Sequence, residues 1–385
     1  MGHIISYVKR QKENSFMELP FNEVDALILS QFIYLKLDNL IPTPSEKKPC
    51  VYLYEITNRM DYDKVFEDKR YAKDNKALLK AMVESKRYRR MQLNYFSQIT
   101  SVTVETQFAA MTCFLENGPT VIVYRGTDET LVGWKEDFNM FFKEPVTGQS
   151  LSSLYLKQVS EMIEGGFLVE GHSKGGNFAV YASMNAPDEV QQRIERVYSF
   201  DSPGFRPEIL ESVDFNKIKG RISKFLPRAS FFGMILQSQE EYQVVDCSSV
   251  GIMQHNPYNW QVEGEKLKRI EELDKGSVFV NETFNQWLYG LNDEELHLFA
   301  EIWYHTLRQA NVNTVLDFLK EPAKSLARLA EVIKETDEDT KEQVKDLALS
   351  LIKAVHEHRE KKTLSIKARL EKIMIKGLIQ EEEEK

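Results

Sequence analysis

Apolar and polar positions follow a helical period near the start of the chain. Residues 22–37 carry apolar side chains on a broad face directly behind Asn22, which predicts a helix with Asn22 as its N-cap. Residues 56–94 are strongly charged and are also expected to be helical. Near Thr100 the pattern becomes strand-like. The first 100 residues of the chain therefore predict a helical region, at about residues 20–95, before a sheet begins.

Beyond Thr100, short apolar runs alternate with longer helical patterns. The expected strands are residues 107–115, 120–126, 167–171, 193–201, 221–226 and 241–249, and the expected helices among them are residues 150–165 and 174–187. Strands that alternate with helices are typical of a mainly parallel sheet covered on both faces. The sequence therefore predicts the α/β class.

The pattern changes again after about residue 290, where Gly and Pro become scarce and charge rises. Residues 325–335, 340–358 and 365–380 each carry apolar residues at helical spacing, and an acidic tip, Glu381 to Glu384, follows. Because 385 residues exceed one ordinary core, we expect a main domain at 1–290 and a helical extension at 291–385. The extension is expected to pack on the main domain or to form a homodimer face.

Composition limits the partners. The net charge is −9 and the pI about 5.5, which argues against nucleic acid, because phosphate binding needs clustered Lys and Arg. Three dispersed cysteines, Cys50, Cys113 and Cys247, favour free thiols in a reducing compartment. No CxxC or HExxH motif supports a metal site. The first residues lack the pattern of a signal peptide, so the expected location is the cytoplasm, without a transmembrane segment or cofactor.

Candidate chemistry centres on Ser173. The stretch Gly171-His172-Ser173-Lys174-Gly175 matches G-x-S-x-G and lies between an expected strand and an expected helix. A serine hydroxyl is a weak nucleophile unless it is exposed beside a base, and a strand-turn-helix elbow exposes it. The helix that follows directs its first N–H groups at a developing oxyanion. The alternative is a plain structural turn.

The stretch FLVEGHSKGG resembles the nucleophile elbow of the α/β-hydrolases. Upstream, TVIVYRGTDETLVGWKEDF is similar to the Arg-Gly-Thr segment of class 3 (fungal-type) lipases. Downstream, VYSFDSPGF and GIMQHNPYNW complete a pattern similar to the bacterial Mbeg-like family, a branch of the α/β-hydrolases. The resemblance covers roughly residues 20–290. It implies the α/β-hydrolase fold and a catalytic triad, but no substrate.

The candidate base is His255. Of seven histidines, it alone follows an expected strand and lies in a turn-rich loop after Ser173, as the Ser, acid, His order of α/β-hydrolases requires. His172, next to the serine, is expected to pack within the elbow. A hydrogen-bonded loop histidine is the alternative for His255.

The candidate acid is Asp201, which ends the strand 193–201. Pancreatic-type lipases carry their acid after this strand. Class 3 lipases carry it after the next one, where residues 225–230 read FLPRAS without a carboxylate. This departure favours Asp201, with Asp246 as the runner-up. The resemblance further implies an oxyanion hole from the N–H groups of Lys174 and Thr127, with the Thr127 hydroxyl as a further donor.

The function that these residues predict is a serine hydrolase of the esterase or lipase type, acting through an acyl-enzyme on a small or lipid-like acyl ester. Residues 138–142 and 231–236 could shape an acyl pocket, although the second stretch is the better candidate for core. Asp128 and Asp137 are expected to brace the Thr127 loop. Amide and thioester substrates stay open. The rival hypothesis is a catalytically silent scaffold that acts through its acidic helical tail.

Overall fold

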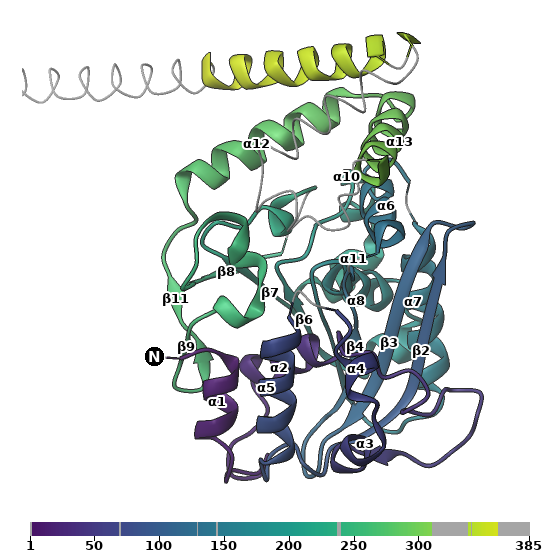
Figure 1. The fold of residues 1–385 in the computed structure, drawn as a ribbon, viewed down its shortest axis with the longest axis vertical. Helices are drawn as coiled ribbons and strands as arrows, with labels where there is room; N and C mark the ends of the chain where they lie inside the picture. The colour runs from purple at the N-terminus through teal and green to yellow at the C-terminus, as the bar shows by residue number, and fades with distance from the viewer. Residues whose placement is uncertain are drawn as a thin grey trace, which may run out of the picture.

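A nine-stranded mixed sheet forms the centre of the described structure, with helices on both faces (Figure 1). The computed structural model describes residues 2–68, 71–128, 130–143, 145–236, 240–309, 338–339 and 341–360. The strand order is β1-β2-β3-β4-β5-β6-β7-β8-β11. The strands are β1 (Val51–Tyr52), β2 (Gln92–Ser101), β3 (Thr106–Phe114), β4 (Thr120–Tyr124), β5 (Phe167–His172), β6 (Ile194–Phe200), β7 (Ile222–Pro227), β8 (Tyr242–Val245) and β11 (Arg269–Ile270), while β9 (Val262–Glu263) and β10 (Lys266–Leu267) form a separate two-stranded sheet.

The middle of the large sheet is parallel and its margins are antiparallel. Strands β4 to β8 pair in parallel, whereas β1 to β4 and the β8–β11 pair are antiparallel. The expected α/β class is confirmed, and the parallel prediction holds for the centre alone. Strand β2 was missed because its half-polar sequence continues a charged helical stretch, and only pairing with β3 makes it a strand.

Helices cover the two faces unequally. Helix α2 lies on one face against β4, β5 and β6, with α1 and α5 packed on it. Helices α6, α7 and α8 lie on the other face, and α11 packs on α8. The helices are α1 (Ile4–Arg10), α2 (Glu23–Phe32), α3 (Leu53–Arg59), α4 (Tyr62–Val65), α5 (Ala72–Val83), α6 (Leu131–Asn139), α7 (Thr147–Ser160), α8 (Lys174–Met184), α9 (Asp188–Gln191), α10 (Pro207–Leu210), α11 (Val213–Lys219), α12 (Lys275–Gly290) and α13 (Asp293–Gln309), with 3-10 turns η1 (Phe232–Met234), η2 (Gly251–His255) and η3 (Pro257–Asn259).

Sequence patterns explain two elements that position the site. Asn22 caps α2 as expected: its side chain accepts from the Val24 N–H, and Asp25 accepts from the Asn22 N–H. Strand β5 is buried along its whole length, and its sequence is apolar from Phe167 to Val169. The carboxyl ends of β4 to β8 thus lie at one edge of the sheet, where ligands bind in open α/β folds.

The C-terminal helices lie together beyond this edge (Figure 1). Helices α12 and α13 and the helix at 341–360 share an apolar cluster that contains Trp287, Leu288 and Leu296. The Trp287 Nε1–H donates to Ser350 Oγ over 2.8 Å. The predicted helices at 325–335 and 365–380 and the acidic tip lie outside the described residues. A domain division at residue 290 stays a prediction, and α12 and α13 pack together across it.

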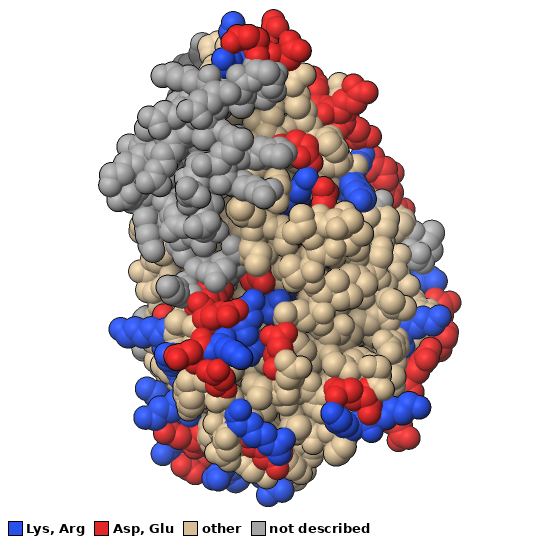
Figure 2. All heavy atoms as spheres, turned by 45° about the vertical axis from the view of Figure 1, so that its right-hand side comes forward, with Lys and Arg blue, Asp and Glu red and all other residues tan. Residues whose placement is uncertain are grey.

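Charge on the surface is mixed. On the face that Figure 2 shows, basic and acidic side chains are interspersed and no large basic patch stands out. None of the helices in the described part of the chain combines the length and the apolar character that a membrane span requires. The three cysteines are free thiols, of which Cys113 is buried.

Candidate active site

The turn between β5 and α8 holds Ser173 in a strained conformation. Its φ is 57° and its ψ −134°, which a residue with a Cβ rarely adopts. The flanking glycines are required by close packing, because a Cβ on Gly171 would overlap the backbone of Gly175, and one on Gly175 would overlap the backbone of Tyr124. The sequence Gly-His-Ser-Lys-Gly therefore forms an elbow with the serine at its tip.

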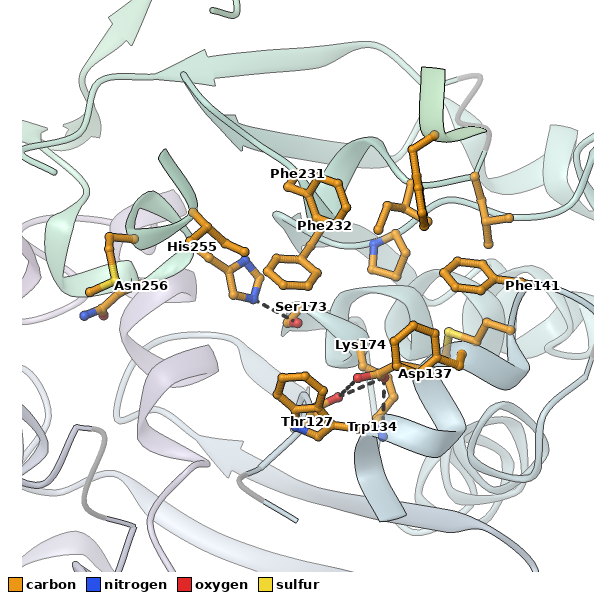
Figure 3. Close-up of a pocket in the computed structure, with 18 of the residues that line it drawn as sticks. Thr127, Trp134, Asp137, Phe141, Ser173, Lys174, Phe231, Phe232, His255 and Asn256 are labelled. Atoms are coloured by element: carbon orange, nitrogen blue, oxygen red, sulfur yellow. Dashed lines mark hydrogen bonds and ion pairs between the residues drawn. The ribbon is translucent and has the colours of Figure 1, made fainter. Parts of the chain in front are cut away.

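Three predicted residues from three segments meet in one hydrogen-bonded chain. The Ser173 Oγ lies 3.0 Å from His255 Nε2, and His255 Nδ1 lies 2.6 Å from Asp201 Oδ2 (Figure 3 shows the first pair). A carboxylate can only accept, so the proton of the neutral imidazole sits on Nδ1. The Nε2 lone pair is then directed at the serine hydroxyl and can take its proton.

Asp201 is fully buried and is held from its other side. Its Oδ1 accepts from the Ser230 hydroxyl over 2.5 Å and from the Gly233 N–H over 3.1 Å. Both donors follow β7, in the segment where the sequence has no carboxylate. Sequence reasoning missed these two donors. The signal that could have found them is their position just after β7, the strand beside the one that ends at Asp201.

The runner-up acid, Asp246, has other partners. It follows β8, and its carboxylate pairs with Lys268 at 2.8 Å and with Arg228 at 3.6 Å. The hydrogen bond from Lys268 lowers the pKa of Asp246, against a smaller opposing effect of burial. The structure therefore places Asp201, and not Asp246, against His255.

His172 supports the loop that carries His255. It is buried, and its Nε2–H donates to the His255 carbonyl over 2.9 Å, so Nδ1 accepts from the Tyr34 hydroxyl at 3.2 Å. The imidazole of His255 lies between two rings, with centroids 4.5 Å from both His172 and Phe232. The packing role predicted for His172 thus has a specific form, a hydrogen bond to the backbone of the candidate base.

Thr127 and Lys174 line the pocket beside Ser173 (Figure 3). Lys174 is the first residue of α8, so its N–H has no partner within the helix. The Thr127 hydroxyl donates to Asp137, at 2.6 and 2.9 Å from its two oxygens, rather than toward the serine. Burial raises the pKa of Asp137 to about 6, although Lys174 and Thr127 oppose the increase. In this conformation the hydroxyl of Thr127 is engaged by Asp137, so of the two predicted Thr127 donors the backbone N–H remains to bind an oxyanion.

Asp128 braces the same loop. It forms ion pairs with Arg125 at 3.6 Å and Lys36 at 3.4 Å, and it accepts from the Thr130 N–H at 2.9 Å. Burial opposes its ionisation, but the two cations lower the pKa of Asp128 to about 2. The expected bracing by Asp128 and Asp137 is therefore seen as direct contacts.

The side chain of Lys174 points away from the reacting atoms into a buried ion pair. Its Nζ donates to Glu136 Oε2 at 2.8 Å and to the Gly133 carbonyl at 3.2 Å. Burial lowers the pKa of Lys174, but Glu136 and Asp137 outweigh burial and leave it raised. The elbow is thereby tied to α6. Sequence reasoning missed Glu136, because nothing in the local sequence shows that this residue, and not the adjacent Asp137, forms the close ion pair with Lys174.

An apolar cavity of about 240 Å³ opens beside Ser173. Both predicted stretches line it, since residues 138–142 contribute Phe138, Met140 and Phe141, and residues 231–236 contribute Phe231, Phe232, Ile235 and Leu236. The stretch 231–236 serves both predicted roles: Ile235 and Leu236 are buried in a core cluster, Phe231 and Phe232 pack against that cluster, and all four side chains line the cavity. Phe284 of α12 also lines the cavity and was not predicted. Among the described residues, no cluster of His, Cys, Asp or Glu could hold a metal.

The model of the Mbeg1-like family matches residues 82–305, and the chain therefore belongs to this family. The resemblance to Mbeg-like proteins is thus confirmed. One solved structure with some similarity is titled "Crystal structure of M37 lipase", with a TM-score of 0.34, 12% identity, and alignment over 56% of this chain and 70% of that one. A search among curated proteins finds no match.

Proposed function

We propose that this protein is a serine hydrolase with an α/β-hydrolase fold that cleaves a carboxylic ester with an apolar acyl group. The observation that carries the proposal is the chain of hydrogen bonds Asp201–His255–Ser173, which ends at the wall of an apolar cavity. A triad is recognised by such geometry and not by position in the sequence.

In the proposed reaction, Ser173 Oγ attacks the acyl carbonyl while His255 Nε2 takes the hydroxyl proton. Asp201 keeps His255 in the reactive tautomer and stabilises the imidazolium. The N–H groups of Lys174 and Thr127 stabilise the oxyanion of the tetrahedral intermediate. His255 then gives its proton to the leaving alkoxide, and a water molecule activated by His255 releases the acid from Ser173.

The cavity favours an apolar acyl group. Its wall is mostly aromatic and aliphatic, and Asp137 is the lining residue that carries an acidic side chain. Thioesters and amides remain chemically possible substrates, because one triad serves them all. A cytoplasmic location and a homodimer through the C-terminal helices remain predictions.

The test is covalent labelling with a fluorophosphonate, followed by mapping of the modified residue, together with hydrolysis of p-nitrophenyl esters. We expect labelling at Ser173 that is lost in Ser173→Ala and His255→Ala. The matched pair is Asp201→Asn against Asp246→Asn. The first should lower kcat/KM by about 10⁴-fold, and the second should leave it within a few-fold. A folded wild type that is neither labelled nor active would favour the scaffold hypothesis.

A further inference from the structure

A path of aromatic rings leads from the candidate base along the cavity wall to Phe284. The ring of Phe232 lies 4.5 Å from His255, Phe231 lies 5.5 Å from Phe232, and Phe284 lies 5.7 Å from Phe231. Trp287, 5.6 Å beyond Phe284, does not line the cavity. These rings form one side of the cavity wall, from His255 to Phe284. Phe284 in turn packs against the apolar cluster of the C-terminal helices.

Phe284 is held in place from several sides. The next residue of α12, Asn285, accepts from the Leu236 N–H at 2.9 Å and donates to the Met234 carbonyl at 2.7 Å. Asn281 donates to the Ser230 carbonyl at 2.8 Å. Helix α12 is therefore bonded to the segment that lines the cavity. Phe141, with its ring 6.3 Å from that of Phe284, lies on the opposite wall from Ser173 in Figure 3.

We propose that Phe284 is the end wall of the acyl pocket and sets the acyl chain length, with medium-chain esters as the substrate class. The inference rests on the proposed function. A cavity of about 240 Å³ has room for an acyl chain of several methylene groups. A longer chain would have to displace Phe284 from its contacts with Phe231 and Trp287.

Selection by chain length requires that Phe284 is held in a fixed position. A hydrophobic pocket distinguishes substrates by whether each added methylene is accommodated, and one methylene changes kcat/KM by about 10- to 200-fold. Such discrimination needs a wall that does not yield. The two hydrogen bonds of Asn285 and the Trp287–Ser350 bond supply that rigidity from both sides of Phe284.

The experiment measures kcat/KM of the full chain for p-nitrophenyl butyrate, octanoate and laurate. We expect the wild type to favour octanoate. Phe284→Ala should raise the laurate-to-octanoate ratio at least tenfold, and Phe284→Trp should shift the preference toward butyrate. Phe284→Leu, a smaller change, should shift the ratio in the same direction as Ala and covers the case in which the Ala variant does not fold.

The control is Leu288→Ala. Leu288 lies one turn further along α12 and is buried in the same helical cluster, but it does not line the cavity. This variant should lose stability and keep the wild-type chain-length profile. An active wild type whose profile is unchanged in folded Phe284 variants would overturn the assignment of Phe284 alone. A wild type without Ser173-dependent hydrolysis would overturn the proposed function as well.

Discussion

Two buried carboxyl groups lie on opposite faces of the sheet near the serine elbow, and they differ in their hydrogen-bond partners. Glu136 accepts four hydrogen bonds, from the Thr106 hydroxyl, the Gln107 and Gly148 N–H groups and the Lys174 ammonium. Glu170, on β5, has both oxygens buried without a hydrogen bond of normal geometry. Burial raises the pKa of Glu170 well above its ordinary value.

The difference shows what a buried carboxyl needs in order to be useful. A charge taken out of water is costly unless a counter-charge and hydrogen bonds replace the solvent. Glu136 has both, and its contacts join the starts of β3, α7 and α8 to α6. Glu170 has no positively charged partner among its described contacts, so burial favours its neutral form. The Glu136 cluster therefore positions the elbow, whereas Glu170 does not.

The largest effect is expected from removal of the ammonium group. Lys174→Met leaves Glu136 as an uncompensated buried charge, which should lower the free energy of unfolding by about 3–5 kcal/mol. Urea unfolding at neutral pH measures it. Because Lys174 also connects the elbow to α6, kcat for ester hydrolysis should fall while the KM changes less. A variant as stable as the wild type would show that the ion pair does not hold the elbow.

The partner substitution should have a smaller effect. Glu136→Gln keeps a carbonyl oxygen for its donors, and Asp137 remains 3.7 Å from the Lys174 ammonium. We expect a loss of about 1–3 kcal/mol. In the double variant Lys174→Met with Glu136→Gln no charge is left unpaired at this pair, so its loss should be less than the sum of the single losses. Additive losses in the urea unfolding cycle would contradict coupling between the two side chains.

The smallest effect, and one of opposite sign, is expected at Glu170. Its folded pKa is raised above the ordinary 4.5, so the unfolded state releases this proton first as pH rises. The stability from this group is complete below about pH 4.5 and is lost as the pH increases toward the folded pKa. Glu170→Gln is neutral throughout. The variant should therefore gain stability relative to the wild type as the pH rises from about 5 to about 8.

Thermal and urea unfolding across this pH range measure the gain. Glu164→Gln is the matched control, because Glu164 is exposed, and it should follow the wild-type curve. A pH-independent difference between Glu170→Gln and the wild type would mean that the carboxyl is already ionised in the folded protein. That result would remove the contrast with Glu136.

Elements whose physical cause is local could be predicted from the amino-acid sequence. The Asn22 cap, the buried run of β5 and the Gly-x-Ser-x-Gly elbow depend on neighbours within a few residues, so the chain specifies them directly. His255 and Asp201 followed from their positions after strands, because the carboxyl ends of parallel strands meet at one edge of the sheet. The stretch at 138–142 was a pocket candidate only because its sequence is apolar.

Contacts between groups that are distant in the sequence became visible in the folded chain alone. The contacts of Ser230 with Asp201, of Glu136 with Lys174 and of Phe284 with Phe231 join residues separated by 29, 38 and more positions. Nothing in the local sequence distinguishes these residues from others of their kind. The antiparallel strands at the two margins of the sheet, such as β2 and β11, likewise form because they pair with neighbouring strands. A contact between distant segments depends on how helices and strands pack, and that information is carried by the whole chain rather than by any one stretch.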